Sequence, residues 1–198
     1  MVVEMLLLLA AYALGSVSSA IVVCRLMGLP DPRTLGSKNP GATNVLRFGG
    51  KQAAALALTG DVLKGLLPVL IAHGLGVRPE VLALTGIAAF LGHLYPVFFG
   101  FRGGKGVATL LGVMIGFHWL LGLGSILIWL VMAFLFHISS LSALVMTAVA
   151  PVIGYWVTGS RSITAVLVAM GILLFWRHRS NIRDLVSGKE EPIGTDRQ

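Results

Sequence analysis

The chain has 198 residues, of which 56% are hydrophobic and only 12% are charged, and its mean hydropathy is +0.89. Soluble domains contain about 25% charged residues, so this composition excludes an ordinary soluble protein and predicts an integral membrane protein. The formal net charge of +7 favours cationic loops facing an anionic leaflet, or an anionic substrate, over a nucleic-acid partner. The single cysteine, Cys24, excludes an intramolecular disulfide and belongs to no metal-binding pattern.

Apolar runs long enough to cross a bilayer recur along the chain. The first three are 3–27, 53–75 and 79–99. Three polar or glycine-bearing interruptions divide the stretch 106–176 into four more segments of roughly 18 residues, close to the minimum for a span. The first run is interpreted as a retained span and not a signal peptide, because Glu4 and no basic residue precedes its apolar core. The sequence therefore predicts an all-α integral membrane protein with seven transmembrane helices.

The distribution of positive charge predicts the orientation in the membrane. With seven spans, one side receives every loop Lys and Arg except Arg78 and Arg161, and Lys64 lies inside a span. The positive-inside rule then places the N-terminus outside and the C-terminus in the cytoplasm. Short half-helices and loops carry the basic segments on the cytoplasmic face, where they can converge on one site. We interpret 1–198 as a single membrane domain whose last residues, 188–198, form a flexible cytoplasmic tail.

The first basic segment, 36–47, reads Gly-Ser-Lys-Asn-Pro-Gly-Ala-Thr-Asn-Val-Leu-Arg. Pro40 and Gly41 predict a turn, and a short helix can start at Ala42 with free N–H groups that attract an anion. An arginine such as Arg47 can bind phosphate through two hydrogen bonds. The candidate substrate-binding residues here are Ser37, Asn39, Asn44, Arg47 and Lys51. The alternative is an interfacial loop whose polar side chains satisfy only their own backbone.

The second segment, 100–109, places glycines and cations between two apolar runs. Glycines let successive N–H groups, here those of Gly103 and Gly104, point at one anion, and Lys105 supplies positive charge. A nucleotide P-loop needs a glycine at the position of Phe99 and Ser or Thr after the lysine, so neither ATP nor GTP is an expected ligand. A tight turn between helices with ordinary membrane-flanking charge is the alternative.

Three polar side chains inside the predicted spans are candidates for a functional role. Asp61 and Lys64 are three residues apart on a helix and can form an ion pair, whose role is structural or substrate-binding. His93, near the end of the third span, is either a phosphate-binding or proton-accepting residue or a packed structural histidine.

The glycines of the following apolar stretch are interpreted as sites of close helix packing: Gly112, Gly116, Gly122 and Gly124.

The third segment, 177–183, follows the last span directly. Membrane anchoring explains its arginines, but not His178 and Asn181, which lie three residues apart on one helical face. Serines at 139, 140 and 142 open the sixth span, where their hydroxyls can cap the helix or bind a ligand.

Several catalytic signatures are missing. No histidine is followed by aspartate five positions later, so the signature of the common glycerolipid acyltransferases is absent, and there is no Gly-x-Ser-x-Gly elbow. Nothing in the sequence predicts zinc, another metal or a cofactor.

Together these segments resemble the acyl-phosphate:glycerol-3-phosphate acyltransferase family, the PlsY type, of bacterial phospholipid synthesis. The similarity spans nearly the whole chain and covers 15–16, 36–47, 61–65, 92–96, 101–109 and 177–183. Lys38 stands where a glycine is usual in the family, and the serines of 139–142 match a serine-rich stretch without fixing which serine acts.

The resemblance implies transfer of a fatty acyl group from acyl phosphate to the sn-1 hydroxyl of glycerol 3-phosphate, giving lysophosphatidic acid and phosphate. It places the enzyme in the bacterial inner membrane with its site on the cytoplasmic side. By analogy the site contains Ser37, Arg47, Lys105, Ser140, His178 and Asn181. The enzyme that makes acyl phosphate is a candidate partner, and a monomer and a homodimer both remain open.

In the mechanism we expect, no protein nucleophile is needed because acyl phosphate is already activated. Lys105, Ser37 and the amides of Gly103 and Gly104 hold acyl phosphate, while Arg47, His178 and Asn181 hold glycerol phosphate. Either the substrate phosphate or His178 takes the hydroxyl proton. Two other classes of protein are alternatives. One is a transporter for an organic phosphate, because charged residues lie inside the spans, and the other is a structural protein that binds anionic lipid.

Overall fold

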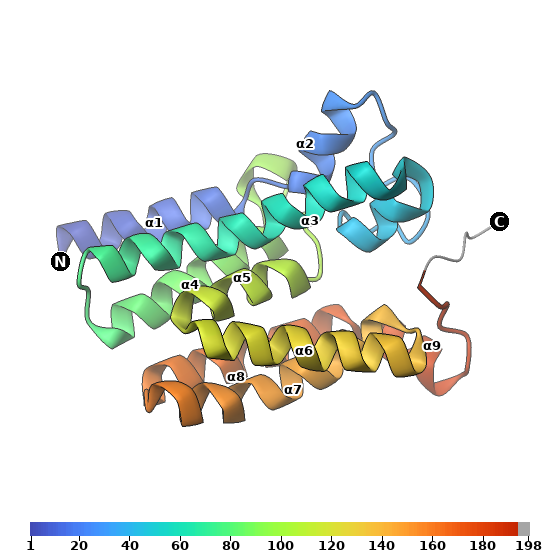
Figure 1. Ribbon diagram of the computed structural model, residues 1–198. Helices are drawn as coiled ribbons and strands as arrows, with labels where there is room; N and C mark the ends of the chain where they lie inside the picture. Colours follow the sequence, from blue (N-terminus) through green and yellow to red (C-terminus); the bar gives the residue numbers. More distant parts are fainter. Residues whose placement is uncertain (194–198) are drawn as a thin grey trace.

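The computed structural model describes residues 1–193, and every regular element in that range is helical. The helices are α1 (Val2–Gly15), α2 (Ser19–Leu26), α3 (Ala42–Gly74), α4 (Pro79–Leu94), the 3-10 turn η1 (Val97–Phe99), α5 (Val107–Phe117), α6 (Trp119–Phe136), α7 (Ser139–Thr158), α8 (Arg161–Arg177) and α9 (Arg179–Val186). The long helices lie side by side in one bundle, with the N-terminus at one end and α2 and α9 at the other (Figure 1). The predicted all-helical membrane fold is confirmed.

Four helices within residues 1–193 are long and apolar enough to cross a bilayer, or up to six if each bent pair counts as one span. The bent pairs are α1 with α2, at 46°, and α8 with α9, at 62°. The stretch 106–176 does form four helices, α5 to α8. The first of them, α5, is shorter than the segment of roughly 18 residues that the sequence predicted. Its 11 residues cover only about 16 Å.

The first predicted span, 3–27, is broken between α1 and α2. The Ser16 hydroxyl donates to the carbonyl of Tyr12 at 2.8 Å, a local bond that competes with continued helix. The break leaves the carbonyl of Val17 without a helical partner, and the buried Lys64 Nζ donates to it at 2.8 Å. Inside a membrane such a carbonyl needs an internal partner, so Lys64 stabilises the bend.

A second break lies within α3. Gly50 has φ 78° and ψ 177°, a conformation open to glycine but strained for other residues, and it separates a short first helix from the membrane-length remainder. The predicted helix start at Ala42 is confirmed, with Gly41 as its N-cap. The segment 36–47 therefore folds as a loop and a half-helix beside α2 instead of entering the bundle (Figure 1).

Glycines bring the backbones of α3 and α5 into direct contact. A Cβ on Gly112 would overlap with the carbonyl oxygen of Val62, and a Cβ on Gly116 would lie 2.8 Å from Val69 Cβ. A Cβ on Gly122 would overlap with Ile115. The predicted close packing is thus confirmed at these three glycines, but it is wrong for Gly124, where a Cβ would lie at an ordinary 3.7 Å from the nearest atom.

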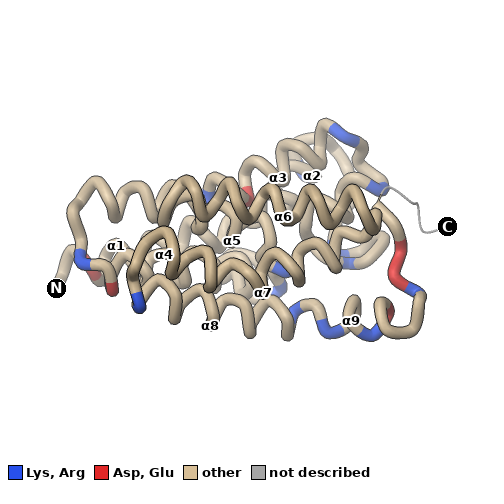
Figure 2. Tube along the Cα trace, turned by 60° about the horizontal axis from the view of Figure 1, so that its bottom comes forward, with Lys and Arg blue, Asp and Glu red and all other residues tan. Residues whose placement is uncertain are grey.

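Positive charge gathers at the end of the bundle that holds α2 and α9, which we call the polar end (Figure 2). At the opposite end, Arg78 is paired with Glu4 at 3.3 Å. The structure therefore separates the charges along the bundle in the way that the loop composition predicted.

Candidate active site

The three basic segments meet at the polar end. Arg177, the last residue of α8, donates to the carbonyls of Gly103 and Gly104 at 2.6 and 3.1 Å, so the third segment contacts the glycine-rich loop. A Cβ on Gly104 would lie 3.3 Å from the carbonyl oxygen of Pro40, which places the first segment against the same loop. The expected convergence is observed.

A chain of hydrogen bonds links side chains from four parts of the sequence. Lys105 Nζ donates to Asn181 Oδ1 at 2.5 Å, which fixes the orientation of the amide. The Asn181 Nδ2 group then donates to Glu190 Oε1 at 2.7 Å, and the Ser140 hydroxyl donates to the same oxygen at 2.5 Å. Among the opening serines of α7, Ser140 is therefore the one that reaches this network, whereas Ser142 bonds back to the carbonyl of Ile138 at 2.8 Å. We call these four residues the Lys105–Ser140 network.

Two glutamates that the sequence did not predict, Glu190 and Glu191, lie in the site. Glu190 completes the network, and Glu191 pairs with Arg47 Nη2 at 3.2 Å. The backbone N–H of Ile193 donates to the carbonyl of His137 at 2.7 Å, which fastens this stretch to the loop before α7. The sequence predicted a flexible tail over 188–198, of which 194–198 lie outside the described residues. Nothing local distinguishes Glu190 from other tail carboxylates, because its partner Ser140 is 50 positions away.

His178 follows the last residue of α8 and is buried beneath the network. Its Nδ1 lies 2.9 Å from the carbonyl of Leu174. A carbonyl can only accept, so Nδ1 carries the hydrogen and Nε2 presents a lone pair. Burial and the positive charge of Lys105 lower the pKa of His178 to about 4. The imidazole is therefore neutral at pH 7 and can accept a hydrogen bond at Nε2.

The lowered pKa of His178 predicts a loss of stability in acid. The unfolded chain takes up a proton as the pH falls through about 6.5, but the folded chain does so only near pH 4, so stability is full above that window and falls within it. We expect the free energy of unfolding to drop by roughly 2 to 3 kcal/mol more in the parent than in His178→Gln between about pH 7 and pH 4.5. Chemical denaturation in detergent at both pH values measures this difference. Parallel losses in the two proteins would contradict it.

The glycine-rich loop is held by a backbone bond to the end of α4 as well as by the Arg177 side chain. The N–H of Gly104 donates to the carbonyl of His93 at 3.3 Å, so this amide is used inside the fold, although the sequence predicted that it would face an anion. A Cβ on Gly103 would overlap with the same carbonyl, which explains the glycine there. Gly106, with φ 94°, turns the chain into α5. Lys105 is thus placed by a loop with little freedom to move.

In the first segment, Asn44 organises the loop. Its Nδ2 group donates to the carbonyls of Pro32 and Leu35 at 2.9 and 3.1 Å, and its Oδ1 accepts from the backbone N–H of Ser37 at 3.0 Å. Within residues 1–193 the Ser37 hydroxyl makes no hydrogen bond, so it is available to a ligand. Lys38 has φ 56°, a left-handed conformation that costs about 1 to 2 kcal/mol for a residue other than glycine. That geometry explains why glycine suits this position.

The remaining predicted residues lie at the edges of the site. His93 is buried, with Nδ1 3.7 Å from Asp61 Oδ1, and a Cβ on Gly104 would overlap with its Nε2. Asp61 also forms the predicted ion pair with Lys64, at 2.8 Å, and both side chains are almost fully buried. Asn39 is half-buried beside Gly41, while Lys51 is exposed at the start of the long part of α3.

Comparison with known proteins identifies the family of this chain. Residues 5–188 match the family model described as glycerol-3-phosphate acyltransferase. Proteins named glycerol-3-phosphate acyltransferase from Thioalkalivibrio sulfidiphilus and Methylococcus capsulatus are 57% and 55% identical. The first alignment covers 95% of this chain and 93% of the relative, and the second covers 100% of both.

Two solved structures share the fold. A crystal structure of PlsY, an integral membrane glycerol 3-phosphate acyltransferase, in its glycerol 3-phosphate form superposes with a TM-score of 0.92 at 40% identity, covering 97% of this chain and 96% of that one. The lysophosphatidic acid form gives 0.89 at 39% identity, covering 96% and 94%. The family expected from the sequence is confirmed, and this chain belongs to the glycerol-3-phosphate acyltransferase family of the PlsY type.

Proposed function

We propose that this protein transfers a fatty acyl group from acyl phosphate to the sn-1 hydroxyl of glycerol 3-phosphate, giving lysophosphatidic acid and inorganic phosphate. The related PlsY structures are described as glycerol 3-phosphate and lysophosphatidic acid forms, which correspond to a substrate and a product of this reaction. The observation that carries the proposal is the Lys105–Ser140 network beside Arg47. It gathers an ammonium, a guanidinium, an amide and a hydroxyl at one place, and phosphate binds to such donors.

Glu190 and Glu191 mark where phosphate oxygens fit. The Glu190 carboxylate accepts from Ser140 and Asn181, and the Glu191 carboxylate forms an ion pair with Arg47; phosphate oxygens can take the same partners. We assign Arg47, Asn181 and Ser140 to glycerol 3-phosphate, and Lys105 with the Ser37 hydroxyl to acyl phosphate.

The chemistry needs no protein nucleophile. The glycerol hydroxyl oxygen attacks the acyl carbon, the bond from that carbon to the phosphate oxygen breaks, and the electron pair leaves with phosphate. Lys105 stabilises the charge that develops on the leaving group. His178 is not the base in this scheme, because a group with a pKa of about 4 is a weaker base than a phosphate group, whose second pKa is about 6. The departing phosphate therefore takes the proton.

We further propose seven spans in the bacterial inner membrane, with the N-terminus outside and the C-terminus and active site on the cytoplasmic side. The separation of charge along the bundle supports this orientation (Figure 2). In this arrangement α5 counts as a short span inside the bundle, and α2 and α9 lie at the cytoplasmic interface.

An assay of both products tests the reaction. Purified protein in detergent, given palmitoyl phosphate and glycerol 3-phosphate, should release inorganic phosphate and form lysophosphatidic acid in equal amounts. Folded protein that binds glycerol 3-phosphate but releases no phosphate with any acyl chain length would reject the proposal. Uptake of labelled glycerol 3-phosphate into sealed vesicles would then support the transporter.

A further inference from the structure

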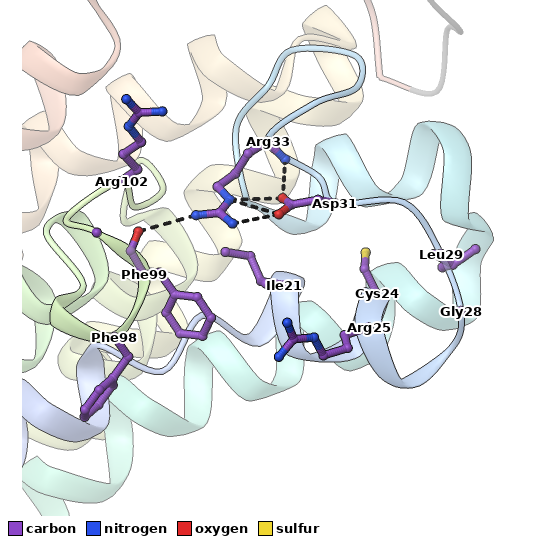
Figure 3. A pocket seen from close by; sticks show the side chains of 11 residues that line it. Ile21, Cys24, Arg25, Gly28, Leu29, Asp31, Arg33, Phe98, Phe99 and Arg102 are labelled. Atoms are coloured by element: carbon purple, nitrogen blue, oxygen red, sulfur yellow. Dashed lines mark hydrogen bonds and ion pairs between the residues drawn. The ribbon is translucent and has the colours of Figure 1, made fainter.

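A second cationic pocket lies at the polar end, outside the Lys105–Ser140 network. It has a volume of about 840 Å³ and lies between α2, the loop that follows it, and the turn 98–102 (Figure 3). Three arginines line it, Arg25, Arg33 and Arg102, together with the apolar side chains of Ile21, Phe98 and Phe99. None of these residues belongs to the site proposed for acyl transfer.

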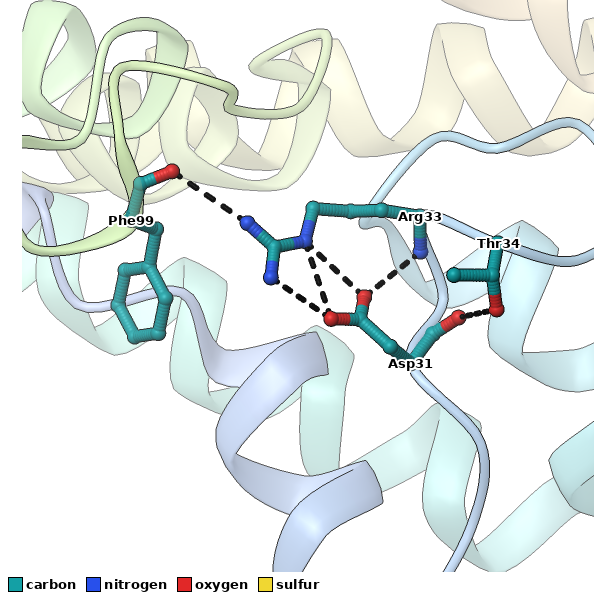
Figure 4. A network of polar contacts seen from close by, with 4 residues as sticks. All are labelled: Asp31, Arg33, Thr34 and Phe99. Atoms are coloured by element: carbon teal, nitrogen blue, oxygen red, sulfur yellow. Dashed lines mark hydrogen bonds and ion pairs between the residues drawn. The ribbon is translucent and has the colours of Figure 1, made fainter.

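Arg33 fixes the wall of the pocket. Its Nε donates to Asp31 Oδ1 at 3.0 Å, its Nη2 donates to Oδ2 at 2.7 Å, and its Nη1 donates to the carbonyl of Phe99 at 3.4 Å (Figure 4). The guanidinium holds the pKa of Asp31 below its usual value. This ion pair therefore neutralises one arginine and ties the loop after α2 to the turn at Phe99.

The other two arginines are less compensated, although the charge of Arg25 also helps to lower the pKa of Asp31. Within residues 1–193, the side chains of Arg25 and Arg102 make no hydrogen bond or ion pair, and both are exposed. Arg25 points toward Phe99, while Arg102 lies at the edge of the pocket, on the other side of the Arg33–Asp31 pair, with its guanidinium pointing away from Arg25 (Figure 3). Because guanidinium groups bind phosphate through paired N–H donors, this pocket has the chemistry of an anion site.

Exposed apolar side chains lie in the two segments that carry these arginines, and one of them, Phe98, lines the pocket. Leu26 is 81% exposed, Phe98 61% and Phe101 57%, and they belong to the two segments that carry Arg25 and Arg102. A free phosphate ion would make no favourable contact with such an apolar surface. A molecule that joins an anionic headgroup to hydrocarbon chains fits both the charge and the apolar rim.

We propose that this pocket binds the phosphate headgroup of an anionic phospholipid of the surrounding leaflet, with Arg25 contacting the phosphate, Arg102 adding positive charge at the rim, and the acyl chains lying along Phe98. This lipid is a bound component and not a reactant, so the inference does not depend on the proposed acyl transfer. The lipid would hold α2 and the turn at Phe99 at the membrane interface.

Native mass spectrometry of the purified protein tests the proposal, with detergent micelles that contain either phosphatidylglycerol or phosphatidylcholine of identical chains. The test variant is the double change Arg25→Gln and Arg102→Gln. The control, Arg179→Gln with Arg183→Gln, removes the same charge from α9 at the same end. We expect tighter binding of phosphatidylglycerol to the parent, and a loss of about fivefold for each pocket arginine removed but not in the control.

Three results would overturn the proposal. The first is equal binding of the two lipids, and the second is an equal loss in the α9 control, which would indicate general surface charge. The third is displacement of phosphatidylglycerol by stoichiometric palmitoyl phosphate, together with a raised KM for palmitoyl phosphate in the test variant, which would assign the pocket to the substrate. If the double variant does not fold, the same measurement is made on the single variants Arg25→Gln and Arg102→Gln, after each has been shown to keep the parent's melting temperature.

Discussion

Replacing Lys105 by alanine is expected to lower the rate of acyl transfer by about a thousandfold, because it removes the ammonium that stabilises the departing phosphate. The side chain also donates to Asn181 at 2.5 Å, so its loss releases the amide that we assign to glycerol 3-phosphate. The measurement is kcat for phosphate release from palmitoyl phosphate under saturating glycerol 3-phosphate. A fall in kcat larger than the rise in KM is the expected signature of a group acting in the transition state.

Lys189→Ala is the matched control for Lys105→Ala. Lys189 is an exposed lysine one residue before Glu190, so its loss changes the net charge near the site without removing a donor from it. Its turnover should stay within about twofold of the parent. A Lys105→Ala protein that melts normally and keeps more than a tenth of the parent's turnover would exclude the role we assign to Lys105.

Replacing Gly112 by alanine should have the largest effect on stability. The added Cβ would overlap with the Val62 carbonyl of α3, and backbone cannot move aside as a flexible side chain can. We expect a loss of about 3 kcal/mol and a melting temperature lower by about 10 °C. Tryptophan fluorescence during heating in detergent measures the change.

Gly124→Ala serves as the control for Gly112→Ala. It adds the same methyl group to a helix of the same bundle, where the nearest atom would be 3.7 Å away. Because alanine favours helix over glycine by about 1 kcal/mol, this variant should melt at or slightly above the parent temperature. Equal melting temperatures for the two variants would show that the contact between α3 and α5 does not limit stability.

Local patterns in the sequence were sufficient to predict several elements. The turn at Pro40 and Gly41 and the helix start at Ala42 depend on neighbouring residues only, and both are present. The pair of Asp61 and Lys64 follows from helical spacing, and it forms at 2.8 Å. Lys105 and the serines at 139, 140 and 142 were candidates from their own segments, and the family resemblance implied that Lys105 and Ser140 share one site, which sequence spacing alone could not predict.

Contacts between distant parts of the chain could not be predicted in this way. Arg177 binds the glycine-rich loop across 73 and 74 positions, and Glu190 reaches Ser140 across 50. The amide of Gly104 was expected to be free because glycine permits that conformation, yet the fold uses it for a bond to His93. Such choices depend on how the helices pack, and the local sequence contains no sign of them.

The short length of α5 affects how strongly dissolved salt weakens the attraction between Lys105 and a bound anion. α5 stops short of the ends of α3 and α6, so the loop carrying Lys105 lies between longer helices instead of at the tip of the bundle (Figure 1). Dissolved ions screen exposed charges within about 10 Å at 0.1 M salt, but they screen charges enclosed by protein much less. We therefore expect phosphate bound near Lys105 to keep its attraction in concentrated salt, whereas an anion held near the exposed Arg25 would lose it. The two proposed anion sites would then respond differently to ionic strength within one small bundle.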